Sequence, residues 1–262
     1  MSLVFLQKKG AIATVQLNRP EKRNAMSFAL LRELVQTARL IKKDKSIRVV
    51  ILTGVGESFS SGIDLTDLND KKNAIFAVWE LIKPGQSLFQ KAFLVWQDLP
   101  VPVIAALHGH CLGAGMQLAL AADIRIATPT CKLSIMESRW GLVPDMGLTQ
   151  TLKGIVPLDV AKELTLTGRV LTGKEAEKLH LVTHLATDPL AAAETLAQEF
   201  LTRSPDALLA GKRVLDAMQH HPKRALRLEK IWQLKLLMGK NRQIAMRKDK
   251  KPELEYQPRQ YH

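Results

Sequence analysis

The sequence predicts an α/β protein with a helical C-terminal part, and three observations support this fold class. Over the first 150 residues, short β-branched runs alternate with helical patterns, an order that implies parallel strands joined by crossover helices. After Pro157 the pattern changes to helices only, with a Gly or Pro signal between one amphipathic run and the next. Apolar residues make up 46% of the 262-residue chain and charged residues 24%, which allows a sizeable core and argues against disorder.

The elements of the first half follow from their periodicity. Residues 3–17 contain two strand-like runs around Lys8, Lys9 and Gly10, which predicts a hairpin. Residues 26–43 place leucines and other apolar side chains at helical spacing. Further along the chain, the patterns predict strands at 48–53, 103–108 and 124–127, and a helix at 114–122.

Residues 99–122 carry no formal charge and are long enough to suggest a membrane helix. Two prolines open this stretch, and histidines and glycines interrupt it, so we expect a buried strand followed by a buried helix. The N-terminus becomes charged after a short apolar run, which does not match a signal peptide. Cys111 and Cys131 are the two cysteines, too few for a disulfide framework, and we expect a cytoplasmic protein.

The formal net charge of +13 is concentrated near the C-terminus. Residues 201–262 hold 15 Lys or Arg against six Asp or Glu. Such a region attracts nucleic acid, an anionic membrane surface or a small polyanionic substrate. The region has three aromatic residues for base stacking, Trp232, Tyr256 and Tyr261, so the sequence does not favour nucleic-acid binding. An RNA-binding protein with vestigial catalysis is the alternative of a different class.

Two loop-to-helix turns follow buried strands. The first, ESFSSGIDL at 57–65, comes after the strand ending at Gly54, and the second, HGHCLGAGMQ at 108–117, comes after the strand ending at Leu107. Backbone N–H groups at such turns are unpaired, so the two turns together are able to hold one anionic oxygen. The order of the glycines matches neither a dinucleotide fingerprint nor a phosphate loop. Close helix–strand packing is the plainer explanation of the glycines taken alone.

Two carboxylates bracket the segment ESRWGLVPD, Glu137 and Asp145. The loop between them contains Gly and Pro, so the two side chains are able to face each other across a small cavity. A solvated or helix-capping role is the alternative for each of them. Asp64 is likewise able to cap a helix that starts at Leu65. The spacing shows no Ser-His-Asp or Cys-His arrangement and no cysteine-rich metal site.

Several motifs, in the same order and at similar separations, resemble those of the crotonase or enoyl-CoA hydratase/isomerase superfamily. The resemblance implies a crotonase-like spiral of ββα units with a helical C-terminal part, binding acyl-CoA thioesters. Residues 1–200 would form the core with the acyl-CoA site, and residues 201–262 would cap it or form a trimer. Homotrimers or hexamers are implied, with no cofactor, metal or membrane. The motifs are LNRPEKRNAMS (17–27), FSSGIDL (59–65), HGHCLGAGMQLALAADIRIA (108–127), ESRWGLVPDMG (137–147) and LTLTGRVLTGKEAEKLHLV (164–182), with a basic tail near 240–252.

By the same resemblance, the backbone N–H groups of Ser61 and Ala114 form an oxyanion hole for the thioester. Gly62, Ile63 and Asp64 are expected to bind substrate. The stretch 67–97, with its aromatic residues Phe76, Trp79, Phe89 and Trp96, is expected to line or cover the acyl pocket, although core packing explains each aromatic as well.

The acidic residues help to distinguish two reactions of the superfamily, hydration and double-bond isomerisation. Hydratases of the superfamily use two glutamates, and here the first of these positions is Gln117, which cannot act as a base, whereas the second is Glu137. The pair Glu137 and Asp145 resembles the dienoyl-CoA isomerase branch, which usually has a further acidic residue at the position of Gln117. We therefore expect a double-bond isomerase. The alternative is an enoyl-CoA hydratase of β-oxidation, with Glu137 as acid and base and Gln117 binding substrate and orienting water.

Overall fold

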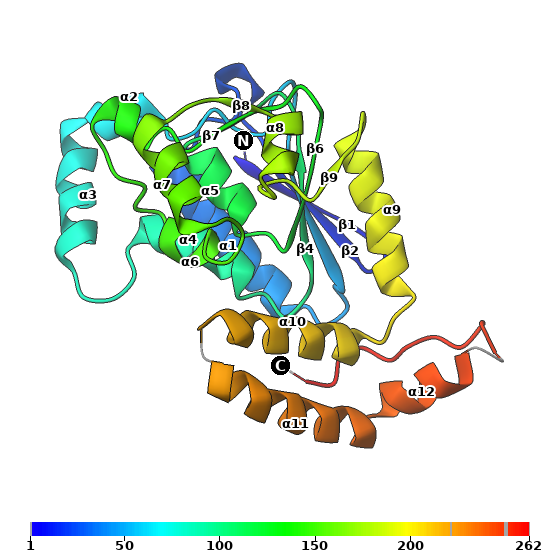
Figure 1. The fold of residues 1–262 in the computed structure, drawn as a ribbon. Helices are drawn as coiled ribbons and strands as arrows, with labels where there is room; N and C mark the ends of the chain where they lie inside the picture. Colours follow the sequence, from blue (N-terminus) through cyan, green and yellow to red (C-terminus); the bar gives the residue numbers. More distant parts are fainter. Residues whose placement is uncertain (1, 221, 249–250, 262) are drawn as a thin grey trace.

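The computed structural model describes residues 2–220, 222–248 and 251–261. A six-stranded sheet in the order β1-β2-β3-β4-β6-β9 forms the centre, and a smaller sheet in the order β5-β7-β8 lies beside it (Figure 1). The strands are β1 (Val4–Lys9), β2 (Ile12–Leu17), β3 (Val49–Gly54), β4 (Val103–Leu107), β5 (His110–Leu112), β6 (Ile124–Ala127), β7 (Lys132–Ser134), β8 (Leu171–Thr172) and β9 (His184–Leu185).

The pairing of the strands confirms the predicted hairpin and the predicted parallel sheet. β1 and β2 pair antiparallel around Gly10, whose φ of 59° suits a tight turn. From β2 to β9 every neighbouring pair in the large sheet is parallel. β4 and β6 add strands to the large sheet, and the strands that follow them, β5 and β7, pair in the small sheet. Successive ββα units therefore build the two sheets together.

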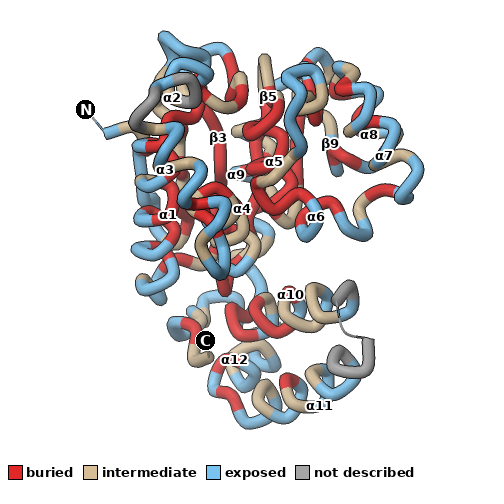
Figure 2. The backbone as a smooth tube through the Cα atoms, turned by 90° about the vertical axis from the view of Figure 1, so that its left-hand side faces the viewer, coloured by how far each residue is buried: buried red, intermediate tan, exposed pale blue. Residues whose placement is uncertain are grey.

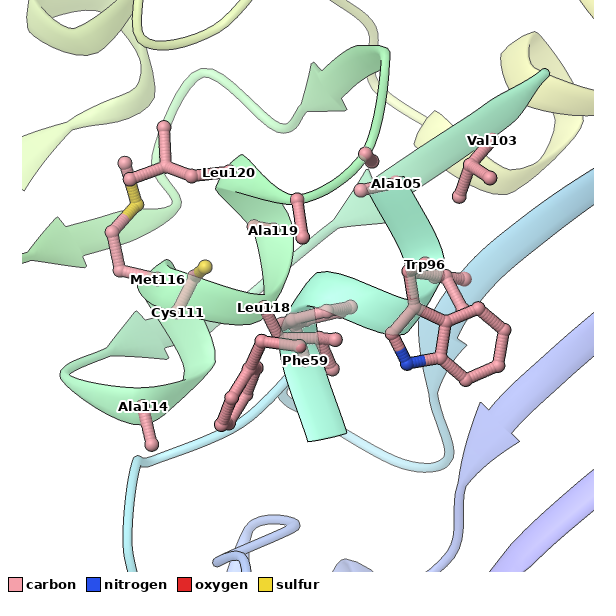
Figure 3. Close-up of a cluster of buried hydrophobic side chains, with 14 of the residues drawn as sticks. Phe59, Trp96, Val103, Ala105, Cys111, Ala114, Met116, Leu118, Ala119 and Leu120 are labelled. Carbon is pink, nitrogen blue, oxygen red and sulfur yellow. The ribbon is translucent and has the colours of Figure 1, made fainter. Parts of the chain in front are cut away.

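The large sheet is covered on both faces. Every residue of β3 is buried, as expected for a parallel strand between two helical layers. Val50 and Leu52 belong to the main core, which includes α1 (Phe28–Lys43), α4 (Leu88–Gln97) and α5 (Ala114–Leu120). Val49 and Ile51 face the other way, toward α9 (Pro189–Leu201). Figure 2 shows this buried centre, and Figure 3 shows Phe59, Trp96 and residues of β4 and α5 packed together.

The uncharged stretch 99–122 forms the buried strand β4 and the buried helix α5, as predicted. It also forms the short strand β5, where the sequence predicted a glycine-rich turn. Among the described residues, no helix combines the length and apolar character needed to cross a bilayer. The other helices of the first 200 residues are α2 (Leu65–Asn69), α3 (Lys71–Ile82), α6 (Leu148–Thr151), α7 (Leu158–Thr167) and α8 (Gly173–Lys178), with 3-10 helices η1 (Pro20–Lys22) and η2 (Glu137–Trp140).

The prediction that only helices follow Pro157 was wrong. β8 and β9 are strands of two residues each, too short to show the alternation by which a strand is recognised in a sequence. These segments are strands because of the hydrogen bonds to their neighbours, since β8 pairs with β7 and β9 pairs with β6.

The C-terminal helices α10 (Pro205–His220), α11 (Pro222–Met238) and α12 (Lys240–Lys248) form a separate layer at the end of the sheet (Figure 1). A partly buried ion pair attaches α10 to the core, since Lys212 Nζ lies 2.6 Å from both carboxylate oxygens of Asp123. The rings of Trp232 and Tyr261 pack edge to face, with centroids 6.0 Å apart. These two aromatics are therefore used in packing. The division at residue 200 and a role in trimer formation stay predictions.

A buried asparagine organises the first loop-to-helix turn. Asn24 is fully buried and has a φ of 56°, a conformation that asparagine tolerates better than most residues. Its Nδ2 donates to the carbonyls of Val55 and Ser58, at 2.9 and 2.7 Å, and its Oδ1 accepts from the N–H of Arg19. The hydroxyl of Ser60 donates to the Asn24 carbonyl. One side chain thus holds the segment that leads into the site.

We predict that Asn24→Ala lowers the free energy of unfolding by about 3 kcal/mol, because it leaves the buried carbonyl of Ser58 and the partly buried Val55 carbonyl and Arg19 N–H without these partners. Urea unfolding measures the change. Asn18→Ala is the matched control, since the Asn18 amide donates to the exposed carbonyl of Ser2, and we expect an effect within about 0.5 kcal/mol. Equal effects of the two substitutions would contradict the role given to Asn24.

Candidate active site

A cavity of about 350 Å³ lies where the first loop-to-helix turn, the start of α5 and the η2 segment meet. Glu137 and Asp145 supply its charged side chains, and the remaining walls are mainly apolar. Asp64 and Gln117, both predicted to bind substrate, do not line it. The lining residues are Phe28, Ser61, Gly62, Ile63, Leu65, Ala77, Leu81, Phe89, Gly113, Ala114, Met136, Glu137, Trp140, Leu142, Val143, Asp145 and Met146.

Backbone pairing leaves one N–H of the first turn unpaired. The Met26 N–H donates to the Gly62 carbonyl at 2.8 Å, and the Asp64 N–H donates to the Met26 carbonyl at 3.0 Å. In this parallel bridge the N–H of the residue between, Ile63, points away from Met26. The Ile63 N–H has no acceptor among the described residues.

The second unpaired N–H comes from Ala114. This residue is the first of α5, so its N–H has no partner within the helix, and the described residues supply no other acceptor for it. The two turns approach closely, because a Cβ placed on Gly62 would lie 2.9 Å from the Leu112 carbonyl oxygen and 3.7 Å from the Ala114 nitrogen. With a φ of 103°, Gly62 also has a backbone conformation that favours glycine.

The prediction that Ser61 donates to an oxyanion was wrong. The Ser61 N–H already donates to the carbonyl of Arg23, at 2.9 Å. Gly62, between Ser61 and Ile63, has a φ of 103°, which interrupts the regular alternation of N–H groups along an extended strand, so the motif itself does not say which N–H faces the cavity. The structure therefore offers the Ile63 N–H, two residues further along, with that of Ala114.

Glu137 is held by one carboxylate oxygen and is free at the other. Its Oε1 accepts from Gln117 Nε2 at 2.7 Å, whereas its Oε2 is buried and has no hydrogen-bond partner among the described residues. Burial raises the pKa of Glu137, and the charge of Asp145 raises it further, against a lowering by its backbone hydrogen bonds and by Gln117. A proton is therefore stabilised on this group relative to a glutamate in water.

Asp145 completes a pair of carboxyl groups at one cavity, as the spacing of the motif predicted. Burial raises the pKa of Asp145 as well. The two carboxyls are half-buried, and the charge of Asp145 raises the pKa of Glu137, so the ionised form of Glu137 is disfavoured while Asp145 is ionised. Such a pair is able to accept a proton and donate another in the same reaction.

The two remaining predicted site residues have structural contacts. Asp64 Oδ1 accepts from the Thr66 N–H at 3.0 Å and so caps α2, and its Oδ2 pairs with Arg19 at 2.9 Å. Although burial raises the pKa of Asp64, these hydrogen bonds leave it below the usual value. The helix-capping alternative is thus the one the structure shows. Gln117 is buried, and its Oε1 accepts from the Met146 N–H at 3.1 Å.

The mouth of the cavity is apolar and open to solvent. Leu81 of α3 and Val143 of the loop before Asp145 are exposed by 62% and 71%. Sequence reasoning missed the wall formed by residues 140–143, because apolar residues in a loop carry no periodicity. Of the four aromatics predicted near the pocket, Phe89 lines it, whereas Trp96 is fully buried in the core.

Comparisons with known proteins point to one family. The profile of the enoyl-CoA hydratase/isomerase family matches residues 7–250. The mitochondrial Delta(3,5)-Delta(2,4)-dienoyl-CoA isomerase of Mus musculus is 36% identical over 249 residues, which cover 89% of this chain and 76% of the mouse protein. The human mitochondrial enoyl-CoA hydratase domain-containing protein 2 is 35% identical and is matched over 78% of this chain and 70% of its own length.

Solved structures show the same fold. An enoyl-CoA hydratase from Bacillus anthracis has a TM-score of 0.89 at 28% identity, covering 98% of this chain and 99% of the other. A Thermobifida fusca protein of the enoyl-CoA hydratase group, solved in complex with CoA, has a TM-score of 0.81 at 34% identity, covering 90% of this chain and 93% of the other.

We predict that Glu137→Gln makes the protein more resistant to urea at neutral pH. The raised pKa of Glu137 means that folding disfavours its ionised form, so its contribution to stability is complete below the pKa of the unfolded chain and is lost as the pH rises. The amide of glutamine removes that loss. The advantage should vanish when the pH is lowered to about 3, below the ordinary carboxyl range. A lower stability of Glu137→Gln at pH 7 would contradict the assignment.

Proposed function

The chain belongs to the enoyl-CoA hydratase/isomerase family, and from this premise we propose that it is an acyl-CoA double-bond isomerase of the dienoyl-CoA isomerase type. The observation that carries the proposal is the pair of half-buried carboxyls, Glu137 and Asp145, at a cavity that also has two unpaired backbone N–H groups. The similarity to dienoyl-CoA isomerases supports the same reaction.

The thioester carbonyl binds between the N–H groups of Ile63 and Ala114. Removing a proton from the acyl chain places negative charge on this oxygen, and two donors fixed in advance by the backbone stabilise that charge without reorganising. Neither N–H has to break an internal hydrogen bond first.

The carboxyl pair moves the protons. The ionised carboxylate takes a proton from one carbon of a 3,5-dienoyl chain, the double bonds shift along the conjugated system, and the protonated carboxyl gives its proton to a second carbon. The product is a 2,4-dienoyl-CoA, and the number of protons on substrate and enzyme together is unchanged. The two carboxyls then exchange protonation states before the next turnover.

Hydration is the second candidate, because the similar structures include that of an enoyl-CoA hydratase from Bacillus anthracis. In that reaction Gln117 would help to orient water. However, the Gln117 amide already bonds Glu137 and the Met146 N–H and does not line the cavity. This arrangement favours isomerisation over hydration.

The walls of the cavity indicate the acyl group. Among the side chains that the structure describes, these walls include no Lys or Arg, so an acyl chain with a second carboxylate would be buried there without a partner, at a large cost. We therefore propose an uncharged hydrocarbon chain, with the basic C-terminal region attracting the phosphates of CoA and no cofactor in the reaction.

A homotrimer or hexamer is proposed from the surface of the C-terminal helices. Leu215, Leu234 and Met238 are each exposed by 60% or more, and a neighbouring subunit that covered such side chains would remove apolar surface from water.

We predict that the purified protein converts 3,5-dienoyl-CoA to the 2,4-diene, which is followed by its absorbance, and that Asp145→Asn slows this conversion by about 100-fold or more while leaving substrate binding intact. Asparagine keeps the size of the side chain and loses the titratable proton. Asp159→Asn, on the exposed surface of α7, is the control and should keep full activity. Rapid hydration of 2-enoyl-CoA with no diene formed would overturn the isomerase proposal.

A further inference from the structure

The Gln117 side chain connects the two segments that carry the carboxyl pair. It projects from α5, where it is 1% exposed. Its Nε2 donates to Glu137 Oε1 at 2.7 Å, and its Oε1 accepts from the backbone N–H of Met146 at 3.1 Å. Met146 directly follows Asp145 in the chain. One amide therefore bridges the Glu137 carboxylate and the backbone next to Asp145.

We propose that Gln117 is the positioning residue of the carboxyl pair, presenting one oxygen of Glu137 for proton transfer and fixing it relative to Asp145. Its effect on turnover rests on the isomerase function proposed above. The positioning of Glu137 by Gln117 does not depend on that function, because the hydrogen bonds are formed by the protein alone.

In this chain an amide satisfies both neighbours of position 117. The Met146 N–H needs an acceptor, and that contact places the Gln117 oxygen on the Met146 side, so the NH₂ group faces Glu137. A glutamate at position 117 would satisfy Met146 but would bring a second carboxylate against Glu137. An apolar side chain would satisfy neither neighbour.

The bridge also determines which oxygen exchanges protons. Oε1 of Glu137 is held by the Gln117 N–H, and Oε2 is buried without a partner among the described residues. A proton on Oε2 breaks no hydrogen bond. Asp145 is a charged side chain whose field acts on Glu137, and the described side chains that line the cavity include no Lys or Arg to counter it.

Three variants test this role. Gln117→Met has a similar length and makes neither hydrogen bond, whereas Gln117→Glu keeps the shape and the acceptor for Met146 but adds a carboxyl. The matched control is Thr53→Val, which removes a buried hydrogen bond from Thr53 to the Ala106 carbonyl and lies outside the cavity.

The first measurement is the pKa of Glu137 by carbon NMR of carboxyl-labelled protein, with the resonance assigned through Glu137→Gln. A hydrogen bond donated to a carboxylate stabilises its ionised form, so Gln117→Met should raise this pKa by about one unit. Gln117→Glu should raise it further, because two adjacent carboxyls resist ionising together. Thr53→Val should leave it unchanged. If Gln117→Met does not fold, the isosteric Gln117→Glu carries the test.

The second measurement is turnover of 3,5-dienoyl-CoA. Misplacing the reacting groups should lower kcat between about 10- and 100-fold in Gln117→Met, with KM within about twofold because Gln117 does not line the cavity. An unchanged Glu137 pKa and an unchanged kcat, with only a loss of stability as in Thr53→Val, would overturn the positioning role. If the unaltered protein does not isomerise the diene but the pKa shifts as expected, the proposed function fails and the positioning of Glu137 stands.

Discussion

The site depends on how the extended segment 60–64 is hydrogen-bonded. Met26 forms backbone hydrogen bonds with residues 62 and 64, which flank residue 63. The N–H of residue 61 donates to the carbonyl of Arg23, and strand β5 pairs with residue 60. These bonds leave the N–H of Ile63 without an acceptor among the described residues, close to the turn that supplies the first N–H of α5. A shift of the segment by one residue would change which of its N–H groups are paired. The buried Asn24 side chain and the close approach at Gly62 prevent such a shift.

The burial of the site also lowers the stability of the fold, because it disfavours the ionised forms of the two carboxyls. Burial raises the pKa values of both Glu137 and Asp145, which means that their ionised forms destabilise the fold at neutral pH. The large core, which covers both faces of the sheet, stabilises the fold and offsets this destabilisation. Perturbed carboxyls in a cavity are characteristic of sites that transfer protons.

The sequence was sufficient for the elements with clear periodicity. The hairpin, the parallel strands and the buried helix after the glycine-rich turn follow from alternation and helical spacing. The strands of two residues do not, because they exist only through pairing. Ser61 illustrates a second limit, since a motif locates the turn but not the direction of each N–H. Gln117 illustrates a third: its type excluded a general base, and its two hydrogen bonds became evident only from distances.

The central claim is that two backbone N–H groups hold the thioester oxygen, and Ala114→Pro tests it most directly. Proline is tolerated at the first position of a helix, where it removes an N–H that has no partner in the helix. The variant should therefore fold normally and bind acyl-CoA, while turnover of 3,5-dienoyl-CoA falls by about 100- to 1,000-fold. A folded Ala114→Pro protein that turns over substrate at the unaltered rate would contradict the claim.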